Sequence, residues 1–112
     1  MSIQGKSFRD DILEIAIGPI EAISVDSWNE WRQDDPRHIP LIPFMGKCVP
    51  WDTVKDLLNY SYDPSYGSLD CHMITAWTAT QVIYIHEYDG ATWPESVPRN
   101  PDPIKLTLST PS

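Results

Sequence analysis

Basic residues are scarce in this sequence, which has eight Lys and Arg against sixteen Asp and Glu and a formal net charge of −8. Nonspecific binding to duplex nucleic acid requires Lys and Arg to neutralise phosphates, so the balance argues against direct binding to duplex DNA. The acidic surface can simply keep the chain soluble, or it can mimic nucleic acid and occupy the basic groove of another protein. Both interpretations stay open, because the acidic residues are dispersed and form no long run.

Cysteines and long apolar segments are also lacking. Cys48 and Cys71 are the two cysteines, too few for a disulfide framework, and we expect both to be free, buried thiols in a reducing cytosol. No segment approaches the roughly 20 apolar residues that span a membrane, and the N-terminal stretch lacks the pattern of a signal peptide. We therefore expect no membrane association. The length of 112 residues predicts a single domain, residues 1–112.

Motifs of enzymes and cofactor sites are absent as well. The sequence contains no P-loop, GxGxxG, HExxH or GxSxG pattern. Cys71 and His72 are adjacent in a predicted strand and point to opposite faces, so they cannot pair as nucleophile and base. His72 could meet His86 across a hairpin, but with Asp70 or Glu87 they would make an incomplete metal site. We expect no catalytic residues, no metal and no cofactor.

Aromatic residues and prolines, by contrast, are abundant. The five Trp and five Tyr are too many for a disordered chain, and eleven Pro spread along the sequence indicate rigid loops. Residues 71–77 and 81–88 alternate with a period of two, which predicts a β-hairpin. Because both faces of this hairpin carry apolar residues, we expect the second face to contact a helix, another protomer or a ligand.

Two short helices are expected beside this sheet. Ser27 and Glu30 have the spacing of a capping box, which predicts a helix over 28–33 with Trp28 and Trp31 on one face. Asp52 or Thr53 can cap a second helix over 52–60. The sequence therefore predicts an α+β fold, a small antiparallel sheet with one or two short helices and Pro-rich ordered loops.

Other segments allow less definite predictions. Residues 10–25 are rich in isoleucine and fit either a helix over 8–17 or short strands broken at Gly18 and Pro19. Residues 34–50 predict an ordered loop in which His38 lies at the surface. Asp89 and Gly90 indicate a turn after which the chain leaves the sheet in a Pro-stiffened polar loop. Residues 104–108 predict an edge strand.

The segments Tyr88-Asp89-Gly90-Ala91-Thr92-Trp93 and Val97-Pro98-Arg99-Asn100-Pro101 resemble small uncharacterised bacteriophage proteins, over residues 55–101. The resemblance implies an accessory, anti-defence protein in the host cytoplasm. Such proteins either sequester a nucleotide immune signal in an oligomeric pocket or block a CRISPR effector.

We expect a non-enzymatic, homo-oligomeric protein that sequesters a nucleotide-like ligand. Stacking side chains would hold the base, and the Arg99 and His86 side chains would meet phosphate. The expected ligand-binding residues are Arg99, Asn100, His86, Tyr84, Trp77, Trp93 and His72. The alternative is an acidic inhibitor of a host defence protein, which would use Trp28, Trp31, Glu30, Asp34, Asp35 and Asp56.

Overall fold

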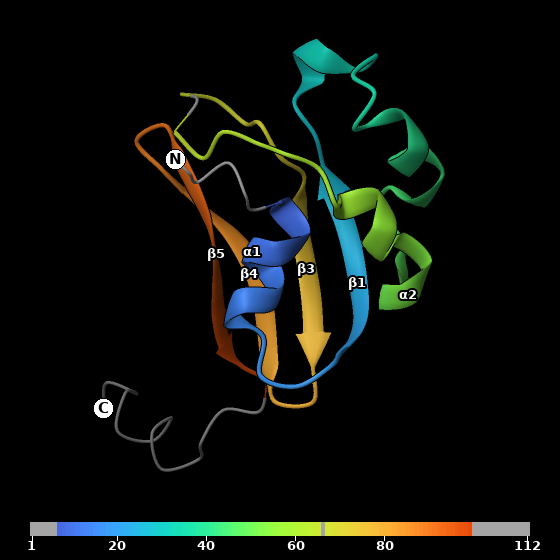
Figure 1. Ribbon diagram of the computed structural model, residues 1–112, viewed down its shortest axis with the longest axis vertical. Coiled ribbons are helices and arrows are strands. Elements are labelled where there is room, and N and C mark those ends of the chain that lie inside the picture. Colours follow the sequence, from blue (N-terminus) through green and yellow to red (C-terminus); the bar gives the residue numbers. More distant parts are fainter. Residues whose placement is uncertain (1–6, 66, 100–112) are drawn as a thin grey trace, which may run out of the picture.

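The chain forms a five-stranded antiparallel sheet with short helices on one face, so the expected α+β fold is confirmed (Figure 1). This computed structural model describes residues 7–65 and 67–99. In chain order the elements are α1 Phe8–Ile15, β1 Ile20–Ser27, η2 Glu30–Arg32, η3 Ile39–Phe44, β2 Cys48–Pro50, α2 Trp51–Val54, η4 Lys55–Leu58, β3 Met73–Thr78, β4 Gln81–Tyr88 and β5 Ala91–Pro98, where η marks a 3₁₀-helix. The strand order is β2-β1-β3-β4-β5, so β1 pairs with β3 across a long stretch of chain. Within the described residues, no helix has the length and apolar character needed to cross a membrane.

The isoleucine-rich segment contains both a helix and a strand. Ser7 begins α1 with a capping box, in which its Oγ accepts a hydrogen bond from the Asp10 N–H at 3.0 Å. Gly18 has φ +83°, in the left-handed region that glycine adopts without strain, and it lies at the turn between α1 and β1. The two interpretations of this segment are therefore each half right, because the turn at Gly18 separates two kinds of element.

The predicted short helices are shorter than expected. The segment over 28–33 forms only the single turn η2, capped by Asn29 and not by Ser27. Trp28 is 7% exposed and Trp31 is 86% exposed, so the prediction that they share one face was wrong. The second helix begins at Trp51, ahead of both predicted caps, and tightens into η4 before ending at Leu58.

The segment after Asp89 and Gly90 is a strand, and the prediction that the chain leaves the sheet there was wrong. Asp89 has φ 52° and Gly90 has φ 84°, both in the left-handed region that a two-residue hairpin turn requires. The chain therefore folds straight back as β5, which pairs with β4 from Tyr88 and Ala91 to Gln81 and Pro98. The expected strand over 104–108 lies outside the described residues.

The prolines of β5 lie where an edge strand tolerates them. The residues that flank the two-residue turn form a hydrogen-bonded pair, and so does every second pair along the hairpin. Pro94 and Pro98 fall on the alternate positions, whose N–H groups would point away from β4, and proline has no N–H. Thr92 takes another outward position, and its N–H donates to the Pro64 carbonyl at 2.8 Å. Thus β5 offers few donors to an added strand.

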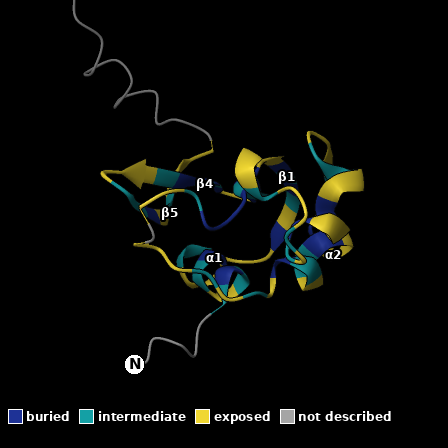
Figure 2. Cartoon of the chain, turned by 90° about the horizontal axis from the view of Figure 1, so that it is seen from above, coloured by how far each residue is buried: buried dark blue, intermediate teal, exposed yellow. Residues whose placement is uncertain are grey.

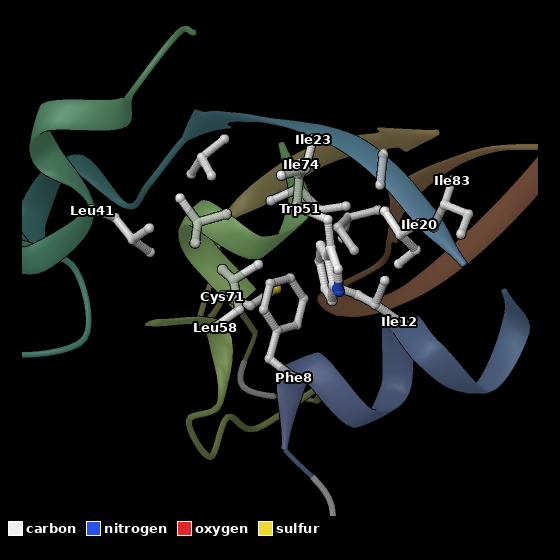
Figure 3. Packing of buried hydrophobic residues seen from close by; sticks show 14 residues of the cluster. Phe8, Ile12, Ile20, Ile23, Leu41, Trp51, Leu58, Cys71, Ile74 and Ile83 are labelled. Carbon is white, nitrogen blue, oxygen red and sulfur yellow. The ribbon is translucent and has the colours of Figure 1, made fainter. Parts of the chain in front are cut away.

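The hydrophobic core lies between one face of the sheet and the helices (Figure 3). Phe8 and Ile12 of α1 are fully buried against the sheet, and Leu58 of η4 fills the neighbouring space. The sheet contributes the inward residues of its alternating strands, which are Ile20, Ile23, Val25, Ile74, Ala76, Ile83 and Ile85. Seen from above, α1 lies on one side of β4 and β5 (Figure 2). In this view no described helix lies on the other side of β4 and β5.

Candidate binding surface

The uncovered side of the sheet gathers most of the exposed aromatic side chains of the strands. We call it the open face. Strand alternation and register assign to it Ala22, Ser24, Asp26, Cys48, Pro50, Met73, Thr75, Trp77, Val82, Tyr84, His86, Tyr88, Ala91, Trp93, Glu95 and Val97. Four of the expected ligand-binding residues, Trp77, Tyr84, His86 and Trp93, belong to this set.

A compact cluster of four side chains occupies the β4–β5 half of the open face. His86 lies opposite Trp93, and Tyr84 lies opposite Glu95. The rings of His86 and Trp93 have centroids 4.8 Å apart. Glu95 Oε1 accepts a hydrogen bond from the Tyr84 hydroxyl at 3.0 Å, and Oε2 accepts one from Trp93 Nε1 at 2.8 Å. The carboxylate is therefore held in a fixed orientation within an aromatic frame.

The electrostatics of this cluster favour a negative charge at its centre. The hydrogen bonds from Trp93 and then Tyr84 lower the pKa of Glu95, and its carboxylate raises the pKa of Tyr84 in return. His86 Nδ1 lies 4.0 Å from Glu95 Oε1. Glu95 is thus ionised at neutral pH, and an anionic group placed here would meet its charge.

Trp77 extends the aromatic surface toward β1. It lies opposite Val82 on β4 and opposite Ala22 on β1, and it is diagonal to Tyr84. Asp26 adds a second carboxylate beside this row, accepting a hydrogen bond from the Thr75 hydroxyl at 2.9 Å. The open face therefore combines flat apolar rings with two acidic groups.

Arg99 lies at the far end of this sheet from the cluster. Its guanidinium donates to Glu21 Oε1 at 2.9 Å and to the Thr78 carbonyl at 2.8 Å. Trp93 and Arg99 are separated by six positions of nearly extended chain, about 20 Å at about 3.3 Å per residue. Because His86 lies opposite Trp93, the structure does not bring Arg99 and His86 to one phosphate. Asn100 lies outside the described residues.

His72 lies on the covered side and is fully buried. The two histidines His72 and His86 therefore point to opposite faces, and the idea that they meet across the hairpin was wrong. Instead, His72 Nε2 lies 3.1 Å from His38 Nδ1, and His72 Nδ1 lies 2.7 Å from the Tyr60 hydroxyl. His38 is 3% exposed, so its expected place at the surface was also wrong. Within the described residues, no group of three or more His, Cys, Asp or Glu side chains could hold a metal ion.

The Tyr60 hydroxyl contacts both the backbone and the ring of His72. Its hydroxyl oxygen accepts from the His72 N–H at 2.9 Å, which leaves the hydroxyl proton free to go to His72 Nδ1. In the tautomer in which the Tyr60 hydroxyl donates to Nδ1, Nε2 of His72 carries the ring proton and donates to His38 Nδ1. Burial, followed by the nearby His38 and Arg37, lowers the pKa of His72 to about 3. Burial also lowers the pKa of His38. Both imidazoles are neutral at pH 7.

A buried ion-pair network borders these histidines. Asp70 is 6% exposed, and its Oδ1 accepts from Arg32 and from Arg37, the latter at 2.9 Å. Its Oδ2 accepts from the Asp63 N–H at 2.7 Å. Burial opposes ionisation of Asp70, but these hydrogen bonds outweigh it and lower its pKa. Arg37 also binds Asp35 at 2.8 Å, and this bond is the main cause that lowers the pKa of Asp35 to about 2.

The six residues of the expected protein-binding surface are dispersed. Trp28 is buried against His38, with ring centroids 5.5 Å apart. Asp35 belongs to the ion-pair network, and Asp56 pairs with Arg9 at 3.1 Å. Glu30, Trp31 and Asp34 remain as an exposed group at η2.

Comparison with known proteins identifies no relative. No family model, no curated protein and no solved structure matches the chain. The candidate site therefore stands on its geometry alone.

Sequence reasoning misses Glu95, which is central to the cluster. Pro94 and Pro98 favour a loop over residues 91–98. In a loop, the alternation of Trp93, Glu95 and Val97 does not predict that these side chains share a face. The signal that could have found the strand is Asp89 with Gly90, a residue pair preferred by two-residue hairpin turns.

The two cysteines also differ from expectation in part, because Cys71 is buried while Cys48 is exposed.

Proposed function

We propose that this chain is a non-enzymatic binding protein that docks a partner protein on the open face of its sheet. The observation that carries the proposal is the aromatic set Trp77, Tyr84, His86 and Trp93, which shares one face that no described helix covers. Aromatic side chains dominate the energetics of protein interfaces, and a surface rich in them commonly marks a binding site.

The face is a better candidate than the edges of the sheet. On the β5 edge, Pro94 and Pro98 remove two outward N–H groups and Thr92 already has a partner. On the other edge, β2 spans only Cys48–Pro50 and ends in a third proline. A partner that adds a strand would find few donors on either side, so binding across the face is favoured.

The negative charge favours a narrower form of this proposal, in which the chain is a bacteriophage accessory protein. A net charge of −8 suits an inhibitor that occupies a basic surface of a host protein, such as a nucleic-acid groove of a defence effector. On this proposal the protein acts in the host cytoplasm and needs no catalytic residue.

Truncating Trp93 tests the proposal. The Trp93→Ala variant should lose a partner that the wild-type protein captures from a bacterial extract, with affinity at least about tenfold weaker, as for interface hot spots. The matched control is Trp31→Ala, which removes an indole that is 86% exposed on η2, away from the sheet. Hydrogen exchange of the purified complex should show protection in β3, β4 and β5. A partner lost from Trp31→Ala but kept by Trp93→Ala would move the interface to η2 and contradict the proposal.

A second candidate function is sequestration of a nucleotide-like ligand in a homo-oligomer. It is favoured by the fact that Trp77, Tyr84 and Trp93 offer rings for base stacking on one surface. Against it stand the Glu95 carboxylate and the pairing of Arg99 with Glu21.

Replacement of Arg99 tests this second candidate. If Arg99 contacts phosphate, Arg99→Ala should weaken nucleotide binding by about 1–3 kcal/mol, the usual loss for a charge-assisted hydrogen bond. Native mass spectrometry of the protein incubated with extract of infected bacteria measures both the bound mass and the oligomeric state. A monomer that carries no nucleotide and instead retains a polypeptide from the extract would favour the protein-binding proposal.

A further inference from the structure

The open face carries negative charge and no compensating basic residue. Among its described residues, Asp26 and Glu95 are acidic, and none is Lys or Arg. Arg99, which follows β5, is ion-paired with Glu21 at 2.9 Å. An occupant that buries Glu95 must therefore bring a positive charge, because an unpaired buried carboxylate is costly.

This charge also argues against a second copy of the chain as the occupant. A two-fold interface through the open face would bury Asp26 and Glu95 of both protomers against a surface whose nearest guanidinium, that of Arg99, is already paired with Glu21. Like charges in such an interface cost affinity and no basic residue of the face relieves them. The chemistry of the surface selects a cationic partner.

Glu95 is prepared to bind one particular cation. Tyr84 and Trp93 each use one site on a different carboxylate oxygen, at 3.0 Å and 2.8 Å. A carboxylate oxygen has two acceptor sites, so each oxygen keeps one for an incoming donor. The side chain is 40% exposed and can be reached from solvent. One free acceptor site on each oxygen is what the two N–H groups of a guanidinium fork require.

The surrounding rings complete this site. The indole of Trp93, the phenol of Tyr84 and the imidazole of His86 border the carboxylate, and the faces of Trp and Tyr attract cations. Arginine fits better than lysine, because its planar guanidinium stacks on rings, binds carboxylates in a bidentate manner and is more weakly hydrated than an ammonium group.

We propose that the open face binds a basic segment of a protein partner through an arginine side chain, whose guanidinium is held by Glu95 and packs on Trp93 and Tyr84. This inference rests on the proposed function and names the chemistry of its partner. The arginine is the anchor of the contact, and Trp77 with Val82 provides the apolar surface beside it.

The probe is an oligo-arginine peptide, and its control is the oligo-citrulline peptide, which has the same shape without the charge. Binding is followed by the indole N–H signals in ¹H–¹⁵N NMR spectra. We expect the Trp93 signal to shift with oligo-arginine and to stay in place with oligo-citrulline. The signal of Trp31, exposed on η2, serves as an internal control for nonspecific binding.

Glu95→Gln removes the charge and keeps an acceptor for Tyr84 or Trp93. It should weaken oligo-arginine binding about tenfold or more, the scale for a lost hydrogen bond to a charged group. Glu87→Gln is the matched variant, because Glu87 is the neighbour of His86 on β4, is exposed and points to the opposite side of the sheet. Glu87→Gln removes one negative charge, as Glu95→Gln does, and it should change the affinity for oligo-arginine less than about twofold.

Several results would overturn the inference. They are equal binding of oligo-citrulline, equal losses for Glu95→Gln and Glu87→Gln, and concentration-dependent self-association that shifts Trp77 and Trp93 without peptide. If oligo-arginine fails but a captured protein still protects β3 to β5 from exchange, the arginine contact is wrong and the proposed function stands. If oligo-arginine binds at Trp93 but no protein protects these strands, the proposed function is wrong.

Discussion

Asp70→Asn should destabilise the protein by about 3–5 kcal/mol, because it removes one partner from a buried network of charges. Asp70 is 6% exposed and is shared by Arg32, Arg37 and the Asp63 N–H. An asparagine has one acceptor oxygen and one NH₂ group, so a donor would face either the guanidinium groups or the Asp63 N–H. The loss is a large part of the roughly 5–15 kcal/mol that holds such a domain together.

Thermal and denaturant unfolding measure this loss directly. A decrease of roughly 10–20 °C in Tm is expected for a domain of this size. Asp56→Asn is the matched control, because Asp56 pairs with Arg9 at 3.1 Å but its side chain is 83% exposed. That pair should contribute less than about 1 kcal/mol, since solvent screens exposed ion pairs. Similar losses in both variants would contradict the account of Asp70 as the centre of a buried network.

Acidification should destabilise the protein well before its carboxylates are protonated. The pKa of His72 is lowered from 6.5 to about 3 by burial, then by His38 and Arg37, and only Asp35 opposes this. As the pH falls below about 6.5, the unfolded chain binds a proton that the folded chain cannot accept. The contribution is therefore complete above pH 6.5 and is lost progressively down to about pH 3.

The expected slope separates His72 from the acidic residues. One proton difference costs about 1.4 kcal/mol per pH unit, so lowering the pH from 6.5 to 4.5 should cost about 2–3 kcal/mol. His38, whose pKa burial also lowers, adds to this loss. Asp35 acts in the same direction, but its pKa is lowered from 3.8 to about 2, so its loss begins only below about pH 4.

Urea unfolding at a series of pH values and constant ionic strength checks this prediction. The imidazole signals of His72 in NMR spectra should stay at their neutral positions at pH 5, which tests the wild-type protein without a core substitution. A flat stability profile from pH 7 to pH 5 would show that His72 is not held neutral.

The β3–β4 hairpin is predictable from sequence because its signal is local. The alternation over 71–77 and 81–88 is enough to put Tyr84 and His86 on one side of their strand, and the register adds Trp77 to the same side. A period-two pattern needs no knowledge of distant contacts, since it depends only on which side chains can share a face.

The covered side cannot be predicted in the same way. His38 and His72 meet across 34 positions of sequence, and the pairing of β1 with β3 brings together segments that are farther apart. The prolines around His38 suggest an exposed loop, but the segment folds over the sheet and stacks Trp28 on His38. Burial there is decided by tertiary packing, which composition does not reveal.

The unequal burial of the two cysteines gives the protein a natural place for a label. Burial raises the pKa of Cys71 to about 12, so its thiol stays protonated and protected, whereas Cys48 is exposed. A maleimide dye therefore attaches at β2 without any engineered cysteine. Cys48 shares a cross-strand row with Ser24, Thr75, Tyr84 and Glu95. Four strand spacings of about 4.8 Å place Cys48 and Glu95, at the two ends of this row, about 19 Å apart. At this distance, energy transfer from the dye to an acceptor on a bound peptide is efficient.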